Sequence, residues 1–302
     1  MEFKQLESFA AVVRLNSFTK AAESLYISQP TISTHIRALE EELGTRLIMR
    51  TTKNIEVTNT GEKLFEYAVN ILELRDRMTQ ECSAGAKQII HLGASTIPSA
   101  YILPEVLPRY GKLSPNAFFV IHQTDSKGVV DGLTDGIYDV GLIGMPCEKE
   151  SIRSQPFCKD RMVLITPVTK EYLSMRETDT SPVEILRRSP VILREKGSGS
   201  KKSADFFLEQ AGLSDEQLEV VARANDPEAI KNLVAGGLGV SIISHRAANN
   251  FLREKRILAF ELPDKANCRD LYVTFRRDQA ERSPVKDFVE FLTKYYNNGP
   301  RE

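Results

Sequence analysis

The chain has 302 residues, of which 41% are hydrophobic and 27% are charged, and its formal net charge is -1. This length exceeds one ordinary domain, and no apolar run approaches the roughly 20 residues that a membrane-spanning helix needs. The composition excludes a membrane-spanning protein, and the balanced charge means that only local clusters of basic residues could bind phosphate.

The opening residues, MEFKQLESFA, contain no cationic stretch followed by an apolar core. No secretory signal is therefore predicted, and the cytoplasm is the expected compartment. The cysteines are scattered, without CxxC or ligand-like spacing, and are expected to be reduced structural thiols, with a redox or metal role as the alternative. They are Cys82, Cys147, Cys158 and Cys268. No cofactor is predicted.

Three short helices are predicted at the N-terminus. Apolar residues at i, i+3, i+4 and i+7 from Leu6 to Val13 predict a first helix that ends near Asn16. Ser17 is a plausible N-cap for a second helix, which reaches Leu25. The segment YISQP then predicts a turn, with Ser28 or Gln29 as the cap of a third helix.

The third helix carries two different faces. Its apolar residues Ile32, Ile36, Leu39 and Leu43 form a stripe that should be buried. The opposite face then presents small residues and one cation, namely Pro30, Ser33, Thr34 and Arg37. Small side chains would let the helix approach a DNA major groove closely, although an ordinary solvated helix face fits the same pattern.

A small hairpin is predicted directly after this helix. Two short apolar runs, Leu47 to Ile48 and Ile55 to Val57, flank the segment RTTKN. The hairpin places Arg50 and Lys53 at its tip, where they could hold DNA phosphates while Gln29 and Ser33 read bases. This second feature favours DNA binding over a merely solvated helix.

The segment LESFAAVVRLNSFTKAAESLYISQPTISTHIRALEEELGTRLIMR, followed by VTNTGEKL, resembles the winged helix-turn-helix of LysR-type transcriptional regulators. The resemblance extends over the whole chain and implies a ligand-responsive, sequence-specific regulator that binds double-stranded DNA as a dimer or tetramer, with RNA polymerase as a candidate further partner. It assigns the DNA contacts to Gln29, Pro30, Thr31, Ser33, Thr34, Arg37, Arg50 and Lys53. The family often carries a basic residue at the position of Thr34 and a glutamine at that of His35, so the bases that are read stay open.

From Asn59 or Thr60 to about Cys82 the pattern predicts one long helix. Its apolar line contains Leu64, Ala68, Ile71, Arg75 and Met78, with Phe65 and Leu72 beside it. This much apolar surface predicts pairing with a second copy along a seam of Leu64, Ile71 and Met78, and the alternative is a core helix of one domain. The predicted domains are residues 1–58, the linker helix and hinge 59–87, and an effector domain 88–302.

After Gln88 apolar strand-like runs alternate with helical segments, which predicts an α/β domain with mostly parallel strands. Polar residues cluster at four junctions where a strand ends and a helix begins, a place where such sheets bind anions. The candidate effector-binding residues are Ser95, Thr96, Ser99, Thr124, Ser126, Ser198, Gly199, Ser200 and Asn225. Taken singly, each junction is equally consistent with a plain helix cap.

This part also resembles the family's effector domain, which has two α/β lobes similar to periplasmic binding proteins. The resemblance implies a first lobe of about 88–163 and 267–296, a second lobe of 164–266, and a ligand between them. The tract STIPSAYILP is similar to that of members tied to sulfur assimilation and to selenium metabolism. The expected effector is therefore a small anion of sulfur, selenium or related metabolism.

Sequence signals of an enzyme were sought as the main alternative. GGLGV lacks the GxGxxG spacing of a dinucleotide loop, and its glycines more plausibly end a helix. The histidines His35, His91, His122 and His245 show no metal or nucleophile spacing. The sequence predicts a regulator rather than an enzyme. A small-molecule enzyme with a DNA-binding appendage and a ligand-independent DNA-packing protein stay open as alternatives.

Overall fold

The computed structural model describes residues 1–302 except 51–54, 82–87, 196–198, 264–266, 281–282 and 299–302. The chain forms two compact units, Met1–Ala86 and Lys87–Glu302, and each is described by itself. None of the described helices has the length and apolarity that a membrane span requires.

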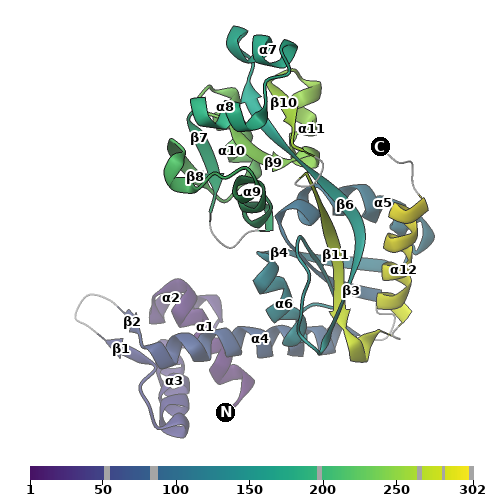
Figure 1. Cartoon of the computed structure of the whole chain (residues 1–302). Coiled ribbons are helices and arrows are strands. Elements are labelled where there is room, and N and C mark those ends of the chain that lie inside the picture. The colour runs from purple at the N-terminus through teal and green to yellow at the C-terminus, as the bar shows by residue number, and fades with distance from the viewer. Residues whose placement is uncertain (51–54, 82–87, 196–198, 264–266, 281–282, 299–302) are drawn as a thin grey trace. The chain divides into compact units, whose positions relative to one another are not determined.

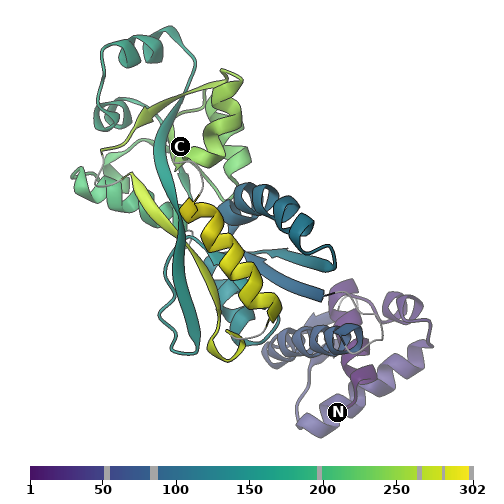
Figure 2. The same ribbon diagram turned by 90° about the vertical axis from the view of Figure 1, so that its right-hand side faces the viewer.

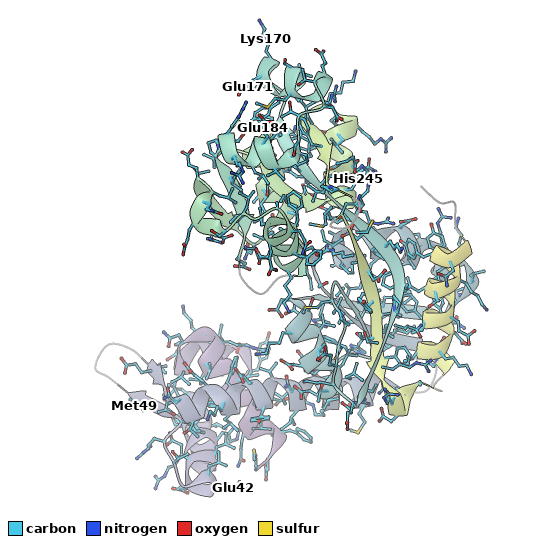
Figure 3. All side chains as sticks on the ribbon, in the orientation of Figure 1. Glu42, Met49, Lys170, Glu171, Glu184 and His245 are labelled. Carbon is cyan, nitrogen blue, oxygen red and sulfur yellow. The ribbon has the colours of Figure 1, made fainter. Side chains whose placement is uncertain are left out.

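The first unit is a helical head with a two-stranded wing and one long helix. Its elements are α1 (Phe3–Leu15), α2 (Phe18–Ser24), α3 (Gln29–Leu43), β1 (Ile48–Arg50), β2 (Ile55–Val57) and α4 (Asn59–Glu81). The predicted caps are confirmed, because the Ser17 side chain accepts from the backbone N–H of Lys20 and the Ser28 side chain accepts from that of Thr31. Met49 on β1 and Glu42 near the end of α3 are labelled in Figure 3.

The predicted apolar stripe of α3 is confirmed except at its last residue. Ile32, Ile36 and Leu39 are buried in the core of the head, together with Phe9 of α1. Leu43 is 41% exposed, so its predicted burial is wrong. Leu43 is the last helical residue before Gly44, whose left-handed backbone ends the helix.

A buried carboxylate fixes the start of the wing. Glu40 on α3 is 9% exposed and accepts hydrogen bonds from the backbone N–H groups of Leu47 and Ile48 and from Nη1 of Arg46. Each bond joins the recognition-like helix α3 to the chain that enters β1. The position of the wing therefore depends on one side chain of α3.

The start of α4 is built on the same strand entry. The Thr58 hydroxyl accepts from the N–H of Gly61 at 3.0 Å and donates to the carbonyl of Arg46 at 2.8 Å. A Cβ on Gly61 would lie 2.3 Å from the carbonyl oxygen of Leu47, so a side chain there would push α4 off the wing. These contacts give a physical reason for Thr58 and Gly61 in the segment VTNTGEKL.

The second unit contains two α/β lobes (Figure 1). The elements from residue 88 to residue 188 are β3 (Gln88–Ala94), η1 (Pro98–Ile102), α5 (Leu103–Leu113), β4 (Ala117–Gln123), α6 (Ser126–Thr134), β5 (Val140–Ile143), β6 (Ile152–Pro167), α7 (Lys170–Glu177) and α8 (Pro182–Arg188). Those that follow are β7 (Val191–Arg194), α9 (Gly199–Gln210), η2 (Asp215–Gln217), β8 (Val220–Ala224), α10 (Pro227–Ala235), β9 (Ser241–Ser244), α11 (His245–Arg253), β10 (Ile257–Glu261), β11 (Cys268–Arg276), η3 (Arg277–Gln279) and α12 (Ser283–Asn298).

The strands are mixed in direction, which corrects the predicted mostly parallel arrangement. The large sheet has the order β10-β6-β11-β5-β3-β4, with β9 also paired to β6. Among the strands of the described residues, the β3–β4, β3–β5 and β7–β8 pairs are parallel, whereas β6 and β11 pair antiparallel with each other and with their other neighbours. The sequence pattern could not show this, because strand direction depends on how the chain crosses between the lobes.

The strand β6 belongs to both lobes. Residues 152–161 pair with β11, and residues 162–167 pair with β9 and β10. In the first lobe, α5 and α12 cover one face of the sheet and α6 covers the other, as Figure 2 shows for α12 and α5. The second lobe has its own core, built around Leu164, Leu193 and Phe207.

The wing anchor gives a first prediction. Glu40→Ala leaves the buried N–H groups of Leu47 and Ile48 without their acceptor, so it should lower the free energy of unfolding of the head by about 2–4 kcal/mol. Urea denaturation of a fragment of residues 1–86, followed by circular dichroism, measures this effect. Glu41→Ala is the matched control, because the Glu41 side chain is 64% exposed, and it should change stability by less than about 1 kcal/mol. Equal effects of the two substitutions would contradict the anchoring role.

Candidate functional site

The structure places six of the predicted DNA-contact residues on α3, outside its buried stripe. Pro30, Thr34 and Arg37 are exposed, and Gln29, Thr31 and Ser33 are half-buried. In the isolated chain, Nε2 of Gln29 donates to the Ser33 hydroxyl at 2.9 Å, and the Thr34 hydroxyl donates to the carbonyl of Pro30 at 3.0 Å. These polar groups point away from the buried stripe and have short, local partners.

The single cation of this face has an acidic neighbour. Nε of Arg37 donates to the Glu41 carboxylate at 2.7 Å, one helical turn further along. Both side chains are mostly exposed, so the pair is weak. Ser33 and Arg37 also line a hollow of about 510 Å³ between α3 and the wing strand β1, with Ile48 and Met49 on its other side.

The two wing cations are only partly covered by the structure. Arg50 is the last residue of β1, and its side chain lies outside the described part of the chain. Lys53 falls within residues 51–54, which are not described. The backbone strands on either side confirm the predicted hairpin, with Ile48 opposite Val57.

Two further side chains, His35 and Tyr26, lie in α3 and in the turn before it. His35 is half-buried, and its Nδ1 lies 2.7 Å from the hydroxyl of Ser8 on α1, so it joins two helices of the head. Tyr26, in the turn before α3, has a φ of 56° and is 95% exposed. A left-handed backbone is unusual for a tyrosine, and sequence periodicity gives no signal for it.

The long helix α4 has two apolar faces, which corrects the predicted seam. Leu64, Phe65, Ala68 and Leu72 pack into the core of the head, and Arg75 pairs with Glu7 of α1. Leu64 therefore does not belong to an outward seam. The exposed apolar residues of α4 form another stripe about 100° away, at spacings of four, three and four residues. They are Tyr67, Ile71, Leu74 and Met78, which are 67%, 39%, 39% and 58% exposed.

A polar cavity of about 290 Å³ lies between the two lobes of the second unit. It is lined by seven of the nine predicted effector residues, namely Ser95, Thr96, Thr124, Ser126, Gly199, Ser200 and Asn225. Ser99 does not line it, and its N–H bonds to the Ser95 carbonyl within the first helical turn. Ser198 lies outside the described residues.

Two of the four helix starts in this cavity are already occupied. Asp125 caps α6 by accepting from the N–H of Gly128, and Asp226 caps α10 by accepting from the N–H groups of Glu228 and Ala229. At these starts the expected free amides are therefore partly used by the chain's own carboxylates. The starts at Ser95 and at Gly199 are the ones that lack such an acidic cap among the described residues.

Two arginines of the cavity were missed from the sequence. Arg194, the last residue of β7, is 5% exposed, and its Nε and Nη1 have no hydrogen-bond partner among the described residues. Burial lowers the pKa of this guanidinium, but arginine stays charged in proteins. The sequence signal for Arg194 was an arginine at the end of an apolar strand pattern, VILR. The sequence contained no corresponding signal for Arg269.

Arg269 is held on the crossing strands. Its Nε and Nη2 donate to Oδ2 of Asp160 at 2.9 and 2.7 Å, and the Asp160 carboxylate also accepts from the hydroxyl of Ser244. Both members of the ion pair are buried. Arg269 thus lines the cavity from a fixed position, whereas the charge of Arg194 is not neutralised by such a bond.

The lobes approach each other closely beside this cavity. A Cβ on Gly199, at the start of α9, would lie 3.1 Å from the carbonyl oxygen of Gly144, just after β5. Among the described residues, no group of three or more metal-ligating side chains occurs, and Cys147, Cys158 and Cys268 are free thiols. The fourth cysteine, Cys82, which was also expected to be a reduced thiol, lies outside the described residues.

Comparison with known proteins identifies the family of both units. Residues 3–62 match the family model of the bacterial regulatory helix-turn-helix protein, lysR family, and residues 83–297 match the LysR substrate binding domain. The chain is 31% identical to an uncharacterized HTH-type transcriptional regulator of Methanocaldococcus jannaschii over 95% of this chain and 97% of that protein. It is 30% identical to the HTH-type transcriptional regulator CysL of Bacillus subtilis over 95% and 100% of the two chains.

Solved structures share this fold. The crystal structure of CbnR, a LysR family transcriptional regulator, matches with a TM-score of 0.80 at 24% identity over 98% of this chain and 99% of that one. The relatives are named as transcriptional regulators, and the family is one of regulators rather than enzymes. The chain belongs to the LysR family of DNA-binding transcriptional regulators.

Proposed function

We propose that this regulator senses a small oxyanion, which binds in the cavity between the lobes. The observation that supports this most is the buried guanidinium of Arg194, whose Nε and Nη1 lack a hydrogen-bond partner among the described residues, although the carboxylates of Glu195 and Asp226 lie near enough to act on its charge. A buried charge without a partner is costly, and an anion in the cavity would supply the missing hydrogen bonds. The hydroxyls of Ser95 and Ser200, both less than 10% exposed, can adapt to its remaining oxygens.

The cavity favours a compact and polar ligand. Its lining combines Ile97, Pro98 and two glycines with hydroxyl and amide side chains, the cations Arg194 and Arg269, and the carboxylates Asp125, Glu195 and Asp226. Tetrahedral anions present several oxygens in different directions, which suits hydroxyls that come from several elements. The tract STIPSAYILP, which supplies Ser95 and Thr96, supports sulfur or selenium oxyanions as the first candidates.

For the head, we propose that the outward face of α3 enters a major groove while the wing contacts the backbone. Gln29 and Ser33 would read base edges after exchanging their mutual hydrogen bond for bonds to DNA, and Arg50 and Lys53 would hold phosphates. Tyr26 would lie beside the phosphates at the entrance of α3. The exposed stripe of α4 would pair with a second copy, which brings two heads to one operator.

One substitution tests the anion proposal through two quantities, the melting temperature of the ligand-free chain and the stabilisation by the ligand. Arg194→Met removes the buried charge, so it should leave the melting temperature of the ligand-free chain unchanged or raise it, while it abolishes stabilisation by the ligand. In the wild type, an anion at a hundred times its dissociation constant should add about 2.7 kcal/mol, which is several degrees. Thermal shift with sulfate, thiosulfate, selenite and selenate measures both effects.

Arg188→Met is the control for this experiment, because Arg188 lies on α8 in the same lobe and is 63% exposed. It should leave the response to anions intact. Stabilisation by neutral or zwitterionic compounds alone, or an anion response that survives Arg194→Met, would contradict the proposal.

The acidic neighbour of Arg37 gives a prediction for DNA binding. Glu41→Gln should raise DNA affinity about threefold at low salt, because it frees the Arg37 guanidinium and removes a negative charge near phosphate. Arg37→Gln should lower affinity and reduce the slope of log affinity against log salt by about one. Fluorescence anisotropy on a duplex that the wild type selects from a random pool measures both, with Glu42→Gln as the control. A loss of affinity in Glu41→Gln would contradict the placement of Arg37.

The stripe of α4 gives a prediction for assembly. Ile71→Asp places a charge in the middle of the apolar stripe, so it should shift the protein toward monomers at micromolar concentration. Glu73→Lys is the control, because position 73 lies on the same helix away from the stripe. Sedimentation velocity of the full chain distinguishes them. If Ile71→Asp sediments like the wild type, the stripe is not the pairing surface.

A further inference from the structure

One side chain reaches from the first lobe to the second beside the cavity. Tyr101 lies in η1, a single π-helical turn in which the N–H of Leu103 bonds to the carbonyl of Pro98. Its hydroxyl donates to Oε1 of Glu228 on α10 at 2.7 Å. Both elements also line the cavity, through Pro98 and through Asp226 next to the start of α10. Within helices, π turns are rare and occur often at functional positions.

The acceptor is held in the second lobe independently of the tyrosine. Nζ of Lys231, whose side chain is fully buried, donates to Oε1 of Glu228 at 2.7 Å and to Oδ1 of Asn250 at 2.8 Å. The ammonium also lies 4.7 Å from the ring centre of Phe251. The Glu228 carboxylate is therefore positioned by α10 and α11 before Tyr101 meets it.

The protonation states of donor and acceptor suit this bond. Burial, followed by the hydrogen bond to Glu228, raises the pKa of Tyr101, so the phenol keeps its proton. Partial burial opposes ionisation of Glu228, but the hydrogen bonds from Lys231 and Tyr101 outweigh it and lower the pKa of the carboxylate. Near neutral pH, the bond thus joins a neutral phenol to an ionised carboxylate, which is a strong type of hydrogen bond.

A second contact between the lobes lies at another wall of the cavity, where Gly199 approaches the carbonyl of Gly144. That contact is made by backbone atoms and has no directional bond. The phenol of Tyr101 and the carboxylate of Glu228 provide a directional bond between the lobes at the wall formed by η1 and α10. Two other polar contacts, Ser244 with Asp160 and Arg246 with Glu105, also join the lobes.

We propose that Tyr101 is a positioning residue that holds the two lobes closed around the bound anion. Breaking its bond to Glu228 lets α10 move away from η1, which separates the cavity walls formed by Thr96 and by Asn225. An anion that contacts both walls favours the closed arrangement. The bond between Tyr101 and Glu228, which we call the latch, also favours the closed arrangement and so strengthens anion binding. This inference rests on the proposed function only for the identity of the ligand in the cavity.

Tyr101→Phe removes the hydroxyl and keeps the ring, so it isolates the bond. Tyr295→Phe is the matched control, because its phenol donates to Glu105 at 2.6 Å but joins α12 to α5 within the first lobe. Hydrogen exchange of the full, ligand-free chain should be faster by about threefold in residues 96–102 and also in 225–231 of the Tyr101→Phe variant. The control should match the wild type in both segments.

Exchange in both segments separates a latch from a local packing role. If Tyr101 only packed its own turn, exchange would rise in residues 96–102 and not in 225–231, and the proposal would be overturned. Unchanged exchange in both segments would overturn it as well. Sulfate titration by calorimetry supplies the second readout, where Tyr101→Phe should weaken binding by about threefold and Tyr295→Phe should not.

The two proposals can fail separately. If sulfate, thiosulfate, selenite and selenate all fail to bind the wild type, the proposed anion is wrong, while the exchange data still decide whether Tyr101 holds the lobes together. If an anion binds the wild type and Tyr101→Phe with equal affinity, the anion proposal stands and the latch is wrong.

Discussion

The ion pair between Asp160 and Arg269 lies where the two lobes are joined, on strands that pair antiparallel over nine positions. Both charges are buried, so each depends on the other, and removing one would leave the other exposed to a medium that solvates it poorly. The hydroxyl of Ser244 on β9 binds the same carboxylate and thereby connects the second lobe to it. Because Arg269 also lines the cavity, the element that joins the lobes is part of the wall that meets a ligand.

The two units of the protein are stabilised in different ways. The head is small, and it gains its rigidity from side chains that cap and anchor, such as Glu40 at the wing and Thr58 at the start of α4. The effector unit is larger and uses one continuous strand, β6, as a support for two cores, of which the larger includes residues of both lobes, such as Leu92 and Ile230. Polar groups collect between those cores, where neither core can bury them.

Local features of the fold were predictable, and tertiary ones were not. The caps at Ser17 and Ser28 and the hairpin between Ile48 and Val57 follow from periodicity and short-range chemistry, which act within a few residues. The direction of β6 and the face that Leu64 covers depend on packing partners far away in sequence. The same reason hid Arg269, whose role comes from contacts with Asp160 more than a hundred residues away.

For the cavity, the residue types at strand ends were informative, because α/β topology brings such ends together. The sequence could not show that Asp125 and Asp226 would occupy two of the helix starts, since a polar residue beside a helix start can cap it or leave it open. Nor could it show that Arg194 lacks a partner, because burial is a property of the assembled lobes.

The two nitrogens of Arg194 that lack a partner have a consequence for the lifetime of the protein in a cell. Opened forms of a chain are degraded, and a ligand that binds only the closed, folded form reduces their population. If the proposed anion binds at Arg194 only in the folded form, the regulator would be degraded faster when that anion is scarce. The abundance of the protein, and not only its conformation, would then follow the supply of the anion.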